Sequence, residues 1–219
     1  MSDTIIAAII GGIGVIVGAF ISFLTTVLNS IAEGKRNKIA NLQKGKEIKR
    51  ECLQNIYQKL IYIINLYPDF SPNDVLEFVD YPPQYSMEAF DSIVTALDYK
   101  IEDYEKQLNL DNIDMDRRYY LKTQINNIRY SKKKIFVCKD RYFNAQKAYQ
   151  SFCKSEKMVI DLYAGQNVKD CLVLFEVIIN NIFISGQCAK TSEFPPINNY
   201  IEACRRNMVQ YMRSDIGIT

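Results

Sequence analysis

The sequence predicts an all-α protein with one N-terminal transmembrane helix, followed by a cytoplasmic bundle of about five helices, one of them long. Two observations lead to this prediction. Residues 4–28 form an uncharged apolar run, and the apolar residues of the remaining chain recur every three or four positions, as they do on one face of a helix. We therefore divide the chain into a membrane anchor (1–32), a basic juxtamembrane segment (33–50) and a helical bundle domain (51–219).

The apolar run is long enough to cross a lipid bilayer. No charged residue occurs between Asp3 and Glu33. At 1.5 Å per residue, a helix over 4–28 reaches roughly 37 Å, and the hydrocarbon core measures about 30 Å. A cleaved signal peptide would need a basic start and a shorter apolar stretch, and this sequence has neither. We therefore expect an uncleaved anchor.

The basic residues near the run predict its orientation. None precedes it, and seven follow it: Lys35, Arg36, Lys38, Lys44, Lys46, Lys49 and Arg50. The positive-inside rule then places the N-terminus outside the cell membrane and residues 33–219 in the cytoplasm. These residues either serve as a topology signal alone or also contact anionic lipid headgroups. In the second case, each basic residue near the surface contributes about 1 kcal/mol to the attraction between the protein and the membrane.

Small residues recur at every fourth position of the predicted span, at Gly14, Gly18 and Ser22. This spacing lines one helix face and lets two helix backbones approach closely, which indicates self-association of the span. The alternative is that small residues are simply common in transmembrane helices, and the pattern does not decide between the two.

The first helices after the anchor are bounded by proline and by capping residues. An amphipathic helix over 46–67 ends before Pro68, and Gly34 and Gly45 are two positions where a break could separate it from the span. Ser71 and Pro72 predict the start of a short helix that reaches about residue 78. Ser86 then caps a helix whose apolar face extends to residue 108.

The second half predicts a long helix followed by two shorter ones. Asp114 is a good N-cap, and 115–163 contains no proline or glycine, which predicts either one helix of forty or more residues or two with a bend. Residues 168–184 are nearly all apolar and predict a buried central helix, because Glu176 and neighbouring polar residues disfavour a second membrane span. A last helix over 198–213 follows a loop that contains two prolines.

Opposite charges are concentrated in two segments. Residues 68–116 are strongly acidic, and 129–141 contain six basic residues: Arg129, Lys132, Lys133, Lys134, Lys139 and Arg141. We favour the interpretation that the acidic helix packs beside the basic one. The alternative is an outward-facing basic surface for lipid, RNA or an acidic partner. Residues 33–219 contain all 27 basic residues and all but one of the 25 acidic ones, and this near-balanced charge disfavours nucleic-acid binding as a property of the whole domain.

The sequence contains no histidine, which excludes Ser-His-Asp and Cys-His catalysis and histidine-bound metals. It contains no phosphate-binding glycine loop. The six cysteines include no C-x-x-C pair, so we interpret them as reduced, small apolar residues in the cytoplasm. We therefore predict no catalytic, cofactor-binding or metal-binding residue and no enzymatic activity.

Two weaker patterns have simple structural interpretations. Glu102, Asp103 and Glu105 form a dense acidic group, and a solvated helix face explains it better than a divalent-cation site. The segment Pro82-Pro83-Gln84-Tyr85 matches a proline-rich ligand pattern, but such short matches arise by chance and we favour a plain loop.

These features predict a single-pass protein of the cell membrane whose cytoplasmic helical domain binds a protein partner or serves as a scaffold. The partners expected are the lipid bilayer, a second copy through the span, and a cytoplasmic protein that the sequence does not identify. The alternative is an oligomerising membrane effector or pore-former that acts through its glycine-striped span. An enzyme that uses carboxylate, Tyr, Lys or Cys chemistry is a third class, with no motif in its favour.

Overall fold

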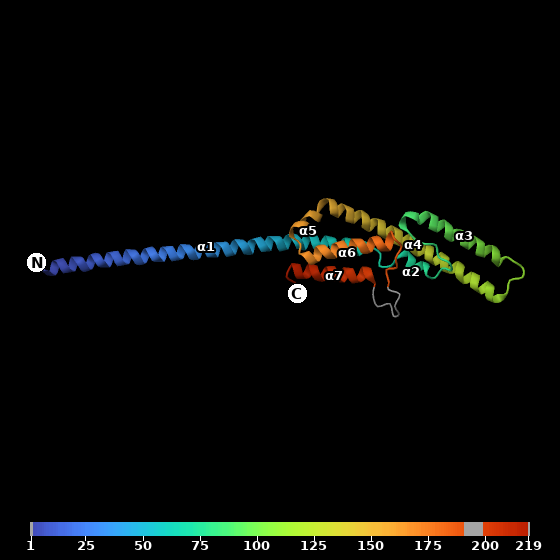
Figure 1. The fold of residues 1–219 in the computed structure, drawn as a ribbon, viewed down its shortest axis with the longest axis horizontal. Helices are drawn as coiled ribbons and strands as arrows, with labels where there is room; N and C mark the ends of the chain where they lie inside the picture. Colours follow the sequence, from blue (N-terminus) through green and yellow to red (C-terminus); the bar gives the residue numbers. More distant parts are fainter. Residues whose placement is uncertain (1, 191–198, 219) are drawn as a thin grey trace. The chain divides into compact units, whose positions relative to one another are not determined.

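The computed structural model describes the backbone of residues 2–190 and 199–218 and the side chains of residues 22–190 and 199–218. In this part of the chain all regular structure is helical and no strand occurs, which confirms the predicted all-α class. The elements are α1 (Ser2–Leu66), α2 (Pro72–Leu76), the short 3-10 helix η1 (Met87–Ala89), α3 (Phe90–Leu108), α4 (Met115–Ser155), α5 (Lys157–Tyr163), α6 (Gln166–Phe183) and α7 (Tyr200–Asp215) (Figure 1).

The chain divides into two compact units, Met1–Glu51 and Cys52–Thr219, and the boundary falls within α1. Neither Gly34 nor Gly45 interrupts this helix. A Cβ atom added at either glycine would have no neighbour within 4 Å, so neither position requires glycine for space.

The predicted membrane span lies mostly outside the residues with described side chains. Its residues 4–21 belong to α1, but only residues 22–28 have described side chains. A search of the described residues finds no helix both long enough and apolar enough to traverse a bilayer.

Three predicted helix starts are confirmed by their caps. The Ser71 side chain accepts a hydrogen bond from the backbone N–H of Asp74, whose carboxylate accepts one from the Ser71 N–H. Ser86 caps η1, which leads directly into α3. The Asp114 carboxylate accepts from the Arg117 N–H at 2.6 Å and starts α4. These side chains bond donors that a helix N-terminus leaves unpaired.

The helical region over 115–163, predicted as one long helix or as two with a bend, is two helices. α4 ends at Ser155, and Glu156 has φ −129° and ψ −17°, outside the helical region, before α5 begins. No proline or glycine marks this break. Glu156 instead contacts Lys59 of α1 at 2.8 Å, a tertiary contact that local sequence does not reveal.

The bundle is built from pairs of neighbouring helices. α3 packs along α4, α2 packs against α4, and α6 packs along α7 (Figure 1). The predicted inward face of the last part of α1 is buried, and so is that of α7. The residues concerned are Leu53, Ile56, Leu60, Ile63, Tyr67, Ile201, Cys204, Met208 and Met212.

The prediction that 168–184 form a buried central helix is confirmed for one face of the helix only. The face of α6 that carries Cys171, Phe175 and Ile179 is buried. Val173 and Val177, on the opposite face, are 57% and 48% exposed. Neighbouring helices therefore cover only one side of α6, and the uniformly apolar sequence did not indicate which side.

Candidate functional site

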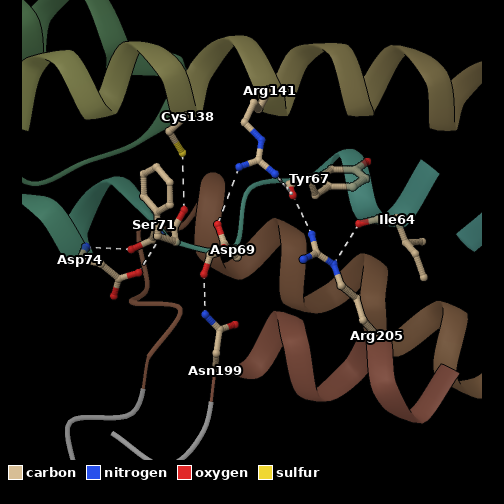
Figure 2. Close-up of polar contacts among 10 residues, drawn as sticks. Ile64, Tyr67, Asp69, Ser71, Asp74, Cys138, Arg141, Asn199 and Arg205 are labelled. Atoms are coloured by element: carbon tan, nitrogen blue, oxygen red, sulfur yellow. Dashed lines mark hydrogen bonds and ion pairs between the residues drawn. The ribbon is translucent and has the colours of Figure 1, made fainter. Parts of the chain in front are cut away.

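The C-terminal end of α1 leaves backbone carbonyl groups that need donors from elsewhere. In a continuing helix, the carbonyl of Ile64 would accept from the N–H of residue 68, but Pro68 has no N–H group. The last turn of α1 also contains no basic side chain. The donors come instead from α4 and α7, which meet the chain at this point (Figure 2).

Arg205 of α7 supplies two of these donors. Its Nε donates to the Ile64 carbonyl at 3.0 Å, and its Nη2 donates to the Tyr67 carbonyl at 2.6 Å. Burial lowers the pKa of the Arg205 guanidinium from its usual value, but an arginine stays protonated at neutral pH. A cation at a helix C-terminus is also stabilised by the helix dipole.

Arg141 of α4 also binds the Tyr67 carbonyl, from the side opposite Arg205 (Figure 2). Its Nη2 donates to the Tyr67 carbonyl at 3.2 Å, and its Nη1 lies 3.8 Å from a carboxylate oxygen of Asp69. We call Arg141 and Arg205, with the carbonyls of Ile64 and Tyr67, the arginine clamp (Figure 2). It joins the end of α1 to α4 and α7.

The chain that follows the clamp is fixed by a second set of polar contacts. Asp74 accepts from the Ala189 N–H at 3.2 Å, in addition to its bond with Ser71. The Asn199 side chain donates to the Asp69 carbonyl and caps the start of α7 (Figure 2). These contacts hold both Ala189 and Asn199 against the turn between α1 and α2.

A small cavity lies beside the clamp. It measures about 250 Å³ and is lined by Tyr67, Tyr142, Gln146, Tyr149, Phe175, Glu176, Ile179 and Asn180. Tyr67 donates to Gln146 Oε1 at 3.0 Å, Tyr149 donates to Glu176, and Lys157 lies 3.3 Å from Glu176. Burial raises the pKa of Tyr67 and of Tyr149, so both phenols stay protonated donors at neutral pH. Such phenols are suited to holding neighbouring groups in place.

The predicted site residues lie in the first unit of the chain. Gly14 and Gly18 lie outside the residues with described side chains. The backbone carbonyl of Ser22 accepts from Thr26 Oγ1 at 2.9 Å. The seven predicted headgroup-contacting residues are all exposed: Lys35, Arg36, Lys38, Lys44, Lys46, Lys49 and Arg50.

The predicted pairing of the acidic and basic segments is confirmed. Arg129 lies 2.7 Å from Glu105, and Lys139 lies 3.7 Å from Asp91. Lys132 bonds the carboxylate of Asp98. Three basic residues of α4 therefore pair with acidic residues of α3. Arg141, in the clamp, pairs with Asp69, which also belongs to the acidic segment. Lys133 is exposed, and Lys134 lies over the rings of Phe70 and Tyr130.

The weaker sequence patterns have structural roles. Tyr85, the last residue of the proline-rich motif, is 1% exposed and bonds the sulfur of Met87, so it is unavailable as a ligand. Glu102 and Asp103 are exposed on α3. In the described part of the chain, no group of three or more His, Cys, Asp or Glu residues is placed to hold a metal ion.

Sequence reasoning did not identify the clamp. Arg141 was recognised only as part of a basic segment, and Arg205 was not singled out. The available signal was Pro68, because a proline there removes the donor for the Ile64 carbonyl and requires another. Which side chain supplies that donor depends on packing between segments far apart in the sequence.

The chain matches no protein-family model, and no curated protein or solved structure matches it either.

Proposed function

We propose that the protein is a single-pass membrane protein, anchored by residues 4–28, with its helical bundle in the cytoplasm as an interaction domain. The observation that carries this proposal is the uncharged apolar run followed at once by a basic cluster. Phe23 and Leu28, at the described end of the run, are 64% and 65% exposed.

Substitutions at the middle of the run test the anchor. Ile16→Arg combined with Val17→Arg places two charges near the bilayer centre. Each charge makes the free energy of membrane insertion less favourable by about 2.5–3.5 kcal/mol. The double variant should move from the carbonate-washed membrane fraction to the supernatant. The control, Ile16→Leu with Val17→Leu, should stay in the membrane fraction. A double-arginine variant that stays membrane-bound would contradict the anchor.

The exposed face of α6 supports the interaction role. Val173, Leu174 and Val177 lie on one stripe and are 57%, 50% and 48% exposed. Contiguous exposed apolar side chains are typical of protein contact surfaces. The occupant that we propose is a second copy of this chain, because association through Gly14 and Gly18 would hold two bundles at a high effective concentration.

Engineered cysteines test this contact in the full-length protein. In a Cys188→Ser background, which removes the exposed native thiol, Leu174→Cys should give a disulfide-linked dimer in membranes under mild oxidation. Gln210→Cys, on an exposed face of α7, is the control and should stay monomeric. Equal cross-linking of the two variants would contradict a contact through α6.

A pore-forming effector is the second candidate, favoured by the four-residue spacing of Gly14, Gly18 and Ser22. Expression of such an effector should dissipate the membrane potential, and Gly14→Leu with Gly18→Leu should restore it. A scaffold should leave the potential unchanged, and its contact with a cytoplasmic protein should persist when the span is replaced by an unrelated one.

A further inference from the structure

Two cysteines meet at the packed interface between α6 and α7. The sulfur atoms of Cys171 and Cys204 lie 3.9 Å apart, although 33 positions separate the residues in the sequence. Each sulfur also lies close to the other residue's backbone carbonyl, at 3.7 and 3.8 Å. The two side chains therefore face each other across the interface.

This placement is suited to a disulfide bond. A disulfide requires the sulfurs to lie about 2.05 Å apart, so they would have to approach by roughly 1.9 Å. Side-chain rotation can supply much of this movement, because the side chains already point toward each other. Among the described residues, no other two cysteine sulfurs lie within hydrogen-bonding distance of each other.

The remaining cysteines have different surroundings and serve as internal controls. Cys138 is buried in α4, its sulfur bonds the Phe70 carbonyl, and burial raises its thiol pKa to about 12. Cys188 is exposed, and Cys52 and Cys153 are partly exposed.

We propose that Cys171 and Cys204 form a reversible disulfide that acts as an oxidation-sensitive latch between α6 and α7. The latch is independent of the proposed membrane function. Cys204 directly precedes Arg205 of the arginine clamp, so the bond would hold α7 next to the residue that joins it to α1.

The oxidant is a small-molecule disulfide of the glutathione type. The Cys171 thiolate attacks one sulfur of the oxidant, forms a mixed disulfide and releases the first small thiolate. Cys204 then loses its proton and attacks the Cys171 sulfur, and the second small thiolate leaves. Two protein thiols are oxidised, one small disulfide is reduced, and both protons end on the released small thiols.

Burial limits how fast the pair reacts with the oxidant. The two thiols share one hydrogen bond in which either sulfur can be the donor, so the same steps can also begin at Cys204. The two residues are 5% and 3% exposed, so the oxidant reaches Cys171 only when the interface opens locally. We therefore expect slow oxidation and a bond that is protected once it has formed.

The test uses the full-length protein in detergent micelles, equilibrated with mixtures of oxidised and reduced glutathione. Remaining thiols are blocked, and linked peptides are identified by mass spectrometry. We expect one intramolecular link, between Cys171 and Cys204, reversed by excess reduced glutathione. Cys188→Ser and Cys138→Ser should retain this link, whereas Cys171→Ser should lose it. Absence of the link from the native protein after equilibration with oxidised glutathione would overturn the proposal.

A second measurement tests the latch itself and needs no substitution. Hydrogen exchange of the α7 backbone amides should slow by about tenfold or more on oxidation, because a cross-link restricts opening of the linked helices. The α3 amides provide the control and should exchange at the same rate in both states. Formation of the link with unchanged exchange in α7 would show that the bond is not a latch.

Discussion

At the scale of single residues, Arg205 has the clearest structural role. It donates to two carbonyls that the end of α1 leaves without helix partners. Its neighbour Arg206 is a natural control, because it is 65% exposed and forms one ion pair with Glu202 at 3.7 Å. Two adjacent arginines of the same helix therefore differ mainly in what they contact.

Arg205→Met should destabilise the fold by about 2–3 kcal/mol, because a hydrogen bond to a charged donor contributes about 1.5–3 kcal/mol. The Ile64 carbonyl loses its side-chain donor, whereas the Tyr67 carbonyl keeps the one from Arg141. Arg206→Met should change stability by about 0.5 kcal/mol or less. Denaturant unfolding followed by tyrosine fluorescence measures both, since the chain contains no tryptophan. Equal effects of the two substitutions would contradict the clamp.

Gly186 is required by its backbone conformation. Its φ is +75°, and an added Cβ would clash with the Tyr85 carbonyl. Gly186→Ala should therefore destabilise the fold by at least about 1–2 kcal/mol. Gly34→Ala, in an open helical position, should instead stabilise α1 by up to about 1 kcal/mol. Thermal unfolding compares the two, and a neutral Gly186→Ala would contradict the described turn.

Local residue chemistry was predictable and distant partners were not. Ser71 and Asp114 were identified as caps because a capping side chain bonds the backbone only two or three residues away. The partners of Arg205 lie 138 and 141 positions away in the sequence. No local pattern specifies such contacts, since they depend on how the helices pack.

At the scale of helices, the positions of the helices were predictable from the apolar pattern, whereas the contacts between them were not. The apolar period located α3, α4, α6 and α7 because their buried faces repeat every three or four residues. It did not locate the break at Glu156, whose side chain contacts Lys59 of a different helix, α1. It also did not show which side of α6 is covered, because both sides are apolar.

Two leucines that lie two positions apart test the orientation of α6. Leu172 is 3% exposed and Leu174 is 50% exposed. Leu172→Ala should cost about 2–5 kcal/mol, since it removes buried methyl groups and leaves a cavity. Leu174→Ala should cost about 0.5 kcal/mol or less in the monomer. Denaturant midpoints of the two variants give the comparison, and the reverse order would mean that α6 is turned the other way.

At the scale of the whole molecule, buried tyrosines link the stability of the bundle to pH. Burial raises the pKa of Tyr57, Tyr67, Tyr85 and Tyr149 above the usual value of about 10. A hydrogen bond to Asp80, with a smaller contribution from burial, raises that of Tyr120 to about 12. The uncharged phenol is the form that the folded state favours.

The sign of the pH effect follows from these raised values. The stabilisation is fully present below about pH 10, the pKa in the unfolded chain, and is lost as the pH rises above it toward the folded-state values. We expect the absorbance of the buried phenolates to appear only together with loss of the helical circular dichroism signal. Ionisation of Tyr57, Tyr67, Tyr85 and Tyr149 while the helices remain intact would contradict the described burial of these four side chains.

The proposed topology has a direct test in the labelling of single thiols by a membrane-impermeant maleimide. Cys188 is exposed in the bundle, and Ser2→Cys adds a thiol on the other side of the proposed span. In intact cells, we expect labelling of Ser2→Cys and no labelling of Cys188 until the membrane is permeabilised. Labelling of Cys188 in intact cells, with Ser2→Cys protected, would contradict an N-terminal anchor that holds the bundle in the cytoplasm.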